Sequence, residues 1–120
     1  TDFRGGKVKL NLKNYQEALQ GISIIEVSGE SCANCLSLLP ILHRIVEARK
    51  DCVLHHLEAS SETMELIKLF KVEAVPTILI MDYCEVYARC RGYQPSEILE
   101  VWIDAKIQEL KNIKKRDINV

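Results

Sequence analysis

The sequence predicts an α/β fold, with a mostly parallel central sheet, helices on both faces and an antiparallel hairpin at one edge. Two observations predict it. Short apolar segments rich in β-branched residues alternate with segments of helical periodicity, as when helices connect and cover strands. Two of these strands then follow each other across a short turn. Because 120 residues suffice for one core, we expect a single domain over residues 1–120, in the order βαβαβαββα.

The first half of the chain predicts two strands and two helices. Residues 7–12 alternate polar and apolar side chains, as an edge strand does, and a short helix follows over residues 14–19. Residues 22–27 are apolar on both sides apart from Ser23 and one carboxylate, which is typical of a buried parallel strand. Helical spacing then extends from Cys32 to about residue 50, and we expect Pro40 to kink this helix.

The second half predicts three strands and two helices. Residues 52–57 form a strand, and a helix follows over about residues 60–71. Residues 77–81 and 85–91 form the hairpin. Pro95 opens a long final helix, because proline is favoured in the first turn.

The charge balance argues against several kinds of partner. Lys and Arg number 16 against 17 Asp and Glu, so we expect no nucleic acid and no anionic membrane as partner. No apolar run approaches the roughly 20 residues that span a bilayer. We therefore expect a cytoplasmic monomer without a cofactor. A signal peptide removed before Thr1 stays open as an alternative.

Cysteine is the most informative residue type. The chain has five cysteines, an odd number, so at least one thiol lacks a partner within the chain. Their spacing is unlike that of a disulfide-stapled mini-protein, which favours a reducing compartment. One pair forms a C-x-x-C motif, and the other three are isolated: Cys32 with Cys35, then Cys52, Cys84 and Cys90.

A C-x-x-C motif at the start of a helix predicts a redox dithiol. The two sulfurs lie one turn apart on the same face, and their Cα atoms are about 5–6 Å apart, within disulfide reach. The free N–H groups of the helix favour a thiolate at Cys32, and the thiolate is the species that attacks a disulfide. Cys35 lies deeper, and we expect it to resolve the mixed disulfide.

A zinc site is the main alternative for the motif. Structural zinc takes four ligands, usually from two such pairs. Adjacent His55 and His56 point to opposite faces of a strand, so they do not share a metal. The other candidate ligands form no second pair: Cys52, Cys84, Cys90 and His43. We therefore expect a redox pair and no metal. We expect structural roles for both histidines, and a contact between His56 and Glu26 stays open.

From about Val8 to Leu110 the chain resembles the thioredoxin family. Five features carry the resemblance, and it is their order and spacing together that are specific. They are the dithiol segment from Ser31 to Cys35 after a buried strand, Pro40 five residues after Cys35, the segment Ala74-Val75-Pro76-Thr77, Gly92 at the end of the hairpin, and Glu26 six residues before Cys32. The resemblance implies a thioredoxin fold and a redox disulfide between Cys32 and Cys35. It also implies a cis Val75–Pro76 bond in a loop that binds substrate through Ala74, Val75, Pro76, Thr77 and Gly92.

The chain departs from the family pattern at several positions. Thioredoxin proper has Trp-Cys-Gly-Pro-Cys, whereas here Ser31 replaces the aromatic residue and Ala33-Asn34 replaces Gly-Pro. Leu36 stands where the family has a basic residue. The family's lysine on the third strand falls on His56 or Leu57. These departures indicate a thioredoxin-like protein whose reductase is not identified by the sequence.

Glu26 is the third candidate catalytic residue. A carboxyl group in a β-branched strand lies in a low dielectric, which favours its neutral form, so it is suited to take a proton from Cys35. The leading hypothesis is a thiol–disulfide oxidoreductase that exchanges electrons with protein disulfides and with an unidentified dithiol reductase. The alternative is a non-catalytic adaptor that binds peptides in the groove between Pro76 and Gly92.

Overall fold

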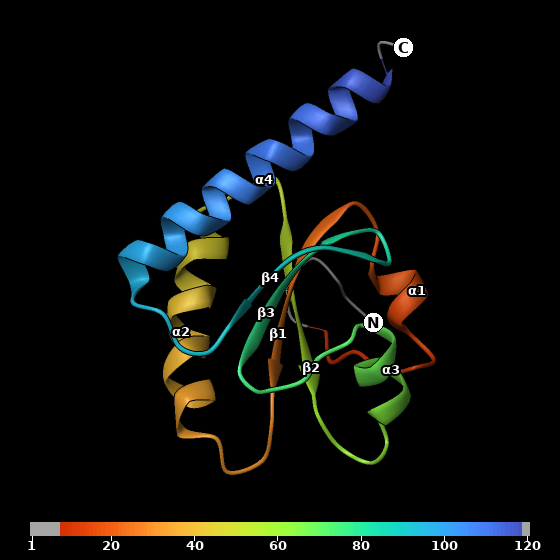
Figure 1. Cartoon of the computed structure of the whole chain (residues 1–120), viewed down its shortest axis with the longest axis vertical. Helices are drawn as coiled ribbons and strands as arrows, with labels where there is room; N and C mark the ends of the chain where they lie inside the picture. The colour runs from red at the N-terminus through yellow and green to blue at the C-terminus, as the bar shows by residue number, and fades with distance from the viewer. Residues whose placement is uncertain (1–7, 119–120) are drawn as a thin grey trace.

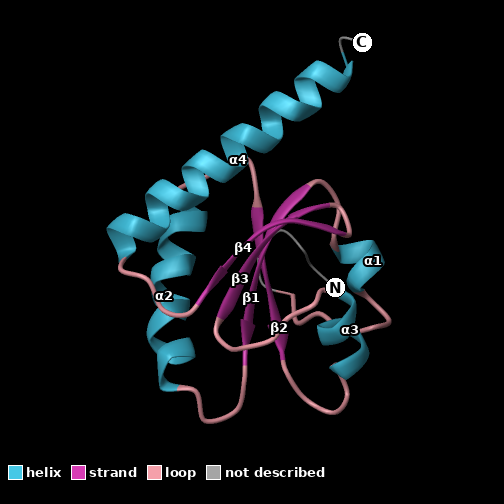
Figure 2. Cartoon of the chain, in the orientation of Figure 1, coloured by secondary structure: helices cyan, strands magenta, loops and turns pink. Residues whose placement is uncertain are grey.

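The chain folds as a sheet between two layers of helices (Figures 1 and 2). The structure, a computed structural model, describes residues 8–118. Within that range the helices and strands follow in this order: α1 (Tyr15–Ala18), β1 (Ile22–Ser28), α2 (Ala33–Glu47), β2 (Val53–Glu58), α3 (Met64–Leu69), β3 (Thr77–Asp82), β4 (Glu85–Arg91) and α4 (Ser96–Ile118). No helix in the described range is long and apolar enough to span a bilayer.

The sheet has the strand order β2-β1-β3-β4. Helices α2 and α4 lie on one side of it, and α1 and α3 lie on the other (Figure 1). Each side has its own apolar cluster, since alternate residues of a strand point to opposite faces. Ile24 and Leu54 belong to the cluster beneath α2 and α4, whereas Ile25 and Leu57 belong to the cluster beneath α1 and α3. This alternation decides which face receives each polar side chain.

The sheet is mixed, so the expectation of a mostly parallel sheet was wrong. Strands β1 and β2 are parallel, but β3 is antiparallel to both β1 and β4. A parallel crossover must carry the chain back along the sheet, about 20 Å for a six-residue strand. The segment between β2 and β3, with the six-residue helix α3, does not return along the sheet, and β3 starts at the end where β2 finishes. The edge hairpin of β3 and β4 is as predicted.

The first predicted strand is reduced to a short extended segment. Lys7 lies outside the described residues, and beyond it the segment makes one isolated parallel bridge, between Lys9 and His56. Two backbone hydrogen bonds support the bridge, from Leu10 N–H to the His56 carbonyl (2.7 Å) and from His56 N–H to the Val8 carbonyl (2.9 Å). The Asn11 side chain then accepts the N–H groups of two following residues and turns the chain away from the sheet.

The other elements differ from the predictions mainly at their ends. Helix α2 contains Pro40 and ends at Glu47, about three residues early. Helix α3 begins at Met64 because Thr63 closes a preceding turn, donating its hydroxyl to the Glu58 carbonyl. The final helix starts at Ser96, directly after Pro95.

Candidate redox site

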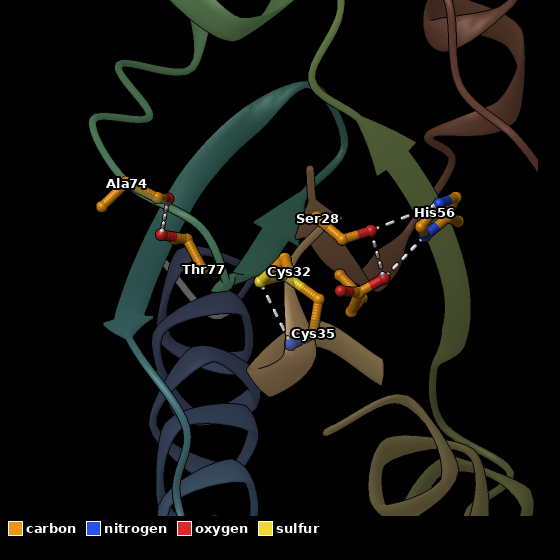
Figure 3. The surroundings of a disulfide bond; sticks show 7 residues. Ser28, Cys32, Cys35, His56, Ala74 and Thr77 are labelled. Carbon is orange, nitrogen blue, oxygen red and sulfur yellow. Dashed lines mark hydrogen bonds and ion pairs between the residues drawn. A yellow bond between two sulfur atoms is a disulfide. The ribbon is translucent and has the colours of Figure 1, made fainter. Parts of the chain in front are cut away.

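Cys32 and Cys35 form a disulfide at the start of α2 (Figure 3). Their Cα atoms are 5.2 Å apart, within the range that the helical spacing predicts. Cys32 is the N-cap of α2, and its sulfur accepts the Cys35 backbone N–H at 3.2 Å. Cys32 is partly exposed, whereas Cys35 is 4% exposed. The pair therefore has one accessible sulfur and one shielded sulfur, as the predicted division of roles requires.

The loop before the disulfide turns sharply at Ser31. Its φ of 57° lies in the left-handed region, which a side chain makes costly. This turn sets Cys32 at the N-terminus of α2, where free N–H groups and the helix dipole favour negative charge. When the disulfide is reduced, the same donors favour a thiolate on Cys32.

The loop around Pro76 has the predicted cis bond between Val75 and Pro76. Two hydrogen bonds hold it: the Thr77 hydroxyl donates to the Ala74 carbonyl at 2.7 Å, and Gly92 N–H donates to the Pro76 carbonyl at 2.8 Å. Ala74 and Val75 are exposed, while Pro76 and Thr77 are buried. Figure 3 shows Ala74 and Thr77 on one side of the disulfide, with Ser28 and His56 on the other.

Gly29 brings the loop before α2 close to the Pro76 loop. A Cβ atom on Gly29 would lie 3.1 Å from a methyl carbon of Val75, tighter than ordinary packing allows. The absence of a side chain thus lets the two loops touch. The five predicted substrate-binding residues and the dithiol gather at one end of the sheet, where β1 and β2 finish and β3 begins.

Glu26 is fully buried, as predicted, near the end of β1, an inner strand of the sheet. It lies opposite His56 on β2 and opposite Ile78 on β3. Its side chain shares the face of Ile24 and Leu54, which α2 covers. Glu26 is therefore in the same layer of the structure as Cys35, which α2 carries.

The Glu26 carboxyl has two polar partners. Its Oε1 atom lies 2.6 Å from His56 Nδ1 and accepts the Ser28 hydroxyl at 3.3 Å. Ser28 Oγ also lies 3.4 Å from His56 Nε2, so the three side chains form a closed network (Figure 3). Among the described residues, none makes a hydrogen bond to the second oxygen, Oε2. A buried carboxyl oxygen without a hydrogen bond is uncommon in folded proteins and marks Glu26 as a candidate functional group.

The remaining three cysteines are free thiols. Burial is the largest cause that raises the pKa of Cys52, to about 11, and burial also raises the pKa of Cys84 and of Cys90. Cys90 lies opposite Ile78, next to the pair formed by Thr77 and Arg91. Across the described part of the chain, no cluster of three or more His, Cys, Asp or Glu side chains is arranged to hold a metal.

Three features of the site were not predicted from the sequence. Ser28 stands two residues after Glu26 in the same strand, so alternation alone places both on one face and could have identified it. The left-handed turn at Ser31 and the close approach at Gly29 have no local signature. Both depend on how the loop lies against β3 and Val75, which local sequence does not specify.

Comparison with known proteins agrees with this geometry. A family model described as thioredoxin matches residues 6–105. In a comparison with curated proteins, none matches significantly.

Several solved structures have a similar fold. The long form of thioredoxin f from spinach chloroplast is 21% identical, with 85% of this chain and 87% of that chain covered and a TM-score of 0.75. A chain in the crystal structure of a ferredoxin:thioredoxin reductase and thioredoxin f2 complex is 19% identical, with coverage of 84% and 94% and a TM-score of 0.76. Thioredoxin f2 of Chlamydomonas reinhardtii is 15% identical, with coverage of 78% and 91% and a TM-score of 0.70. At these identities the likeness concerns the fold.

Proposed function

The chain belongs to the thioredoxin family, and on that premise we propose that it reduces disulfides in other proteins through Cys32 and Cys35. Membership and the Cys32–Cys35 pair make it a thiol–disulfide oxidoreductase in general terms. The finer proposal names protein disulfides as substrates and a dithiol reductase as electron donor.

One observation carries the proposal: an accessible sulfur lies at a helix N-terminus beside an exposed loop that can pair with an extended chain. Cys32 supplies the sulfur, and the backbone of Ala74 and Val75 supplies the loop. A substrate strand that pairs with this backbone would bring its own disulfide next to Cys32. The contact of Gly29 with Val75 holds the two parts together.

The exchange takes two steps. The Cys32 thiolate attacks one sulfur of the substrate disulfide, forming a mixed disulfide and releasing the other sulfur as a thiolate. The Cys35 thiol then loses its proton to Glu26 and attacks Cys32. The bond between Cys32 and the substrate breaks, the Cys32–Cys35 bond forms, and the substrate leaves as its second thiolate. The substrate gains two electrons and the protein loses two.

The cycle needs a reductase that returns two electrons to the Cys32–Cys35 disulfide. A structurally similar chain comes from a complex of ferredoxin:thioredoxin reductase and thioredoxin f2, which supports a reductase as partner. The three unpaired thiols support a reducing compartment, and we therefore propose that the protein acts in the cytoplasm. We further propose that it acts as a monomer.

Trapping tests the proposal. Cys35→Ala removes the resolving thiol, so substrate proteins should accumulate as mixed disulfides on Cys32 that dithiothreitol releases. Cys32→Ala should trap none, because the attacking sulfur is gone. Cys90→Ala is the matched control, since it removes an unpaired thiol and should leave turnover with insulin unchanged. Equal trapping by the two active-site variants would contradict the proposal.

A non-catalytic adaptor is the second candidate, supported by the exposed edge at Ala74 and Val75. An adaptor would bind extended peptides equally well with Cys32 and Cys35 both replaced by Ser, and the wild type would reduce no insulin. That pair of results would favour the adaptor over the oxidoreductase.

A further inference from the structure

The Glu26 carboxyl is enclosed, so a proton that it takes from Cys35 needs an exit. The Glu26 side chain is 1% exposed, whereas the side chain of His56 is 22% exposed. The carboxyl has two described hydrogen-bond partners, His56 Nδ1 at 2.6 Å and the Ser28 hydroxyl at 3.3 Å. Of these two, the imidazole is the one with a second nitrogen through which a proton can leave.

We infer that His56 carries the Glu26 proton to solvent and so sets the rate at which Cys35 resolves the mixed disulfide. This inference rests on the proposed function. The proton passes from the Cys35 thiol to Glu26, from Glu26 to His56 Nδ1, and the imidazolium gives up its Nε2 proton to water. Ser28 Oγ, 3.4 Å from Nε2, fixes the orientation of the ring. An imidazole suits this role because its protonation changes near neutral pH.

The surroundings of His56 allow water to reach it. His56 lines a cavity of about 340 Å³ together with Lys9 from the segment before α1 and His43 from α2. Such a volume holds several waters, each of about 30 Å³. The titratable groups around His56 are Glu26 on β1, Lys9 on the bridged segment and His43 on α2, together with His55 and the exposed Glu58 on its own strand; His55 also lines the cavity. Glu26 is the group in direct contact.

His56 acts through Glu26 and does not touch the sulfur in this scheme, so it is a positioning and proton-transfer residue. The test must therefore distinguish proton transfer by His56 from the hydrogen bond that His56 makes with Glu26. His56→Asn does this, because an asparagine amide keeps a donor near the place of Nδ1 but does not titrate. His43→Gln is the matched control, since it removes another imidazole that lines the same cavity.

The experiment mixes reduced protein with an aromatic disulfide whose thiolate absorbs visible light. The first thiolate released reports the attack by Cys32, and the second reports the attack by Cys35. In the wild type the second phase should rise with pH, because only the neutral ring accepts a proton. His56→Asn should slow the second phase at neutral pH about tenfold or more and reduce that dependence on pH, with the first phase unchanged. Added imidazole should restore the rate in His56→Ala.

Other outcomes would overturn the inference. A normal second phase with a normal pH profile in His56→Asn would mean that His56 only holds Glu26 in place. Equal slowing in His43→Gln would assign the effect to the cavity and not to the contact with Glu26. Equal slowing of both phases in His56→Asn would mean that His56 does not act specifically on the attack by Cys35, and would overturn the inference. If the wild type releases no thiolate at all, the proposed function fails, and this inference fails with it.

Discussion

Carboxylates at the two ends of the sheet are treated in opposite ways. At the end that carries the dithiol, Glu26 is fully buried, and one of its oxygens makes no hydrogen bond to any described residue. At the far end, where α2 finishes and β2 begins, Asp51 is 24% exposed and binds two cations. Arg49 donates to both its oxygens at 2.9 Å, and Lys111 of α4 donates at 2.5 Å.

The two carboxylates therefore have opposite effects on the stability of the folded state. The pKa of the Asp51 carboxyl lies well below its usual range. Hydrogen bonding to Arg49 is the largest cause, and the hydrogen bond to Lys111 lowers this pKa further. The charged form of Asp51 therefore stabilises the folded state, linking α2, β2 and α4. Glu26 gains no such pairing with Lys or Arg among the described residues, and burial opposes its charged form. The Asp51 ion pairs thus stabilise the fold at the far end. At the dithiol end, the buried Glu26 carboxyl lowers stability but serves the proposed reaction.

Thiol reactivity should show the largest contrast within the molecule. In the reduced protein, iodoacetamide at mildly acidic pH should label Cys32 before the other thiols, because the start of α2 favours its thiolate. Cys52, with its pKa raised to about 11 mainly by burial, should react about 100-fold more slowly than an ordinary thiol. Mass spectrometry of tryptic peptides measures the order. Earlier labelling of Cys52, Cys84 or Cys90 would contradict the assignment of Cys32 as the attacking thiol.

Replacing Glu26 by glutamine should slow catalysis and raise stability. The amide cannot accept the Cys35 proton, so the second thiolate release should slow about 100-fold, while alkylation of Cys32 stays nearly unchanged. The free energy of unfolding of the same variant should be about 1 kcal/mol higher, since a neutral isostere avoids burying a charge. Glu58→Gln, at an exposed position two residues beyond His56, should change neither quantity. Full turnover in Glu26→Gln would remove Glu26 from the mechanism.

The equivalent exchange at the far end should have the opposite sign. Asp51→Asn should lower the free energy of unfolding by about 1–3 kcal/mol, because Arg49 and Lys111 lose a charged partner. Urea denaturation at neutral pH measures it, and the rate of disulfide reduction should not change. Asp104→Asn is the matched control. Asp104 also binds Arg49 but is 62% exposed, so its loss should cost well under about 1 kcal/mol.

The pH dependence of stability gives a second measure of Asp51. Because its folded-state pKa lies below the unfolded value of about 4, its contribution is complete above that value. The contribution is lost progressively as pH falls from there towards the folded-state pKa. Wild-type stability should therefore fall more steeply in acid than that of Asp51→Asn. Parallel curves for the two proteins would contradict the ion pair's role.

The sequence predicted those parts of the fold and site that depend on local pattern. Periodicity located the dithiol at a helix start and Glu26 in a buried strand, and both positions are confirmed. Alternation placed His55 and His56 on opposite faces, in agreement with the Glu26 contact of His56 and the contact of His55 with the Ala18 backbone.

What the sequence could not give depends on contacts between distant segments. The direction of β3 is one example, because an apolar strand buried on both faces looks the same in either direction. The pairing of Glu26 with His56 depends on the register between β1 and β2, which no residue near either side chain specifies. The roles of Cys52, Cys84 and Cys90 are likewise not fixed by local pattern.

Backbone strain at the dithiol end should give the smallest effect, and one exchange made at two positions isolates it. Ser31 has a φ of 57°, which costs about 1 kcal/mol for a residue with a side chain. Ser31→Gly removes that cost but stabilises the unfolded state by about 0.5 kcal/mol through its greater conformational entropy. The free energy of unfolding should therefore rise by about 0.5 kcal/mol. Ser37, exposed within α2, has no such strain, and Ser37→Gly should lose about 0.5 kcal/mol through helix propensity. Urea denaturation of both variants measures the difference. If both lost stability equally, Ser31 would be unstrained, and the cost at the dithiol end would fall on Glu26 alone.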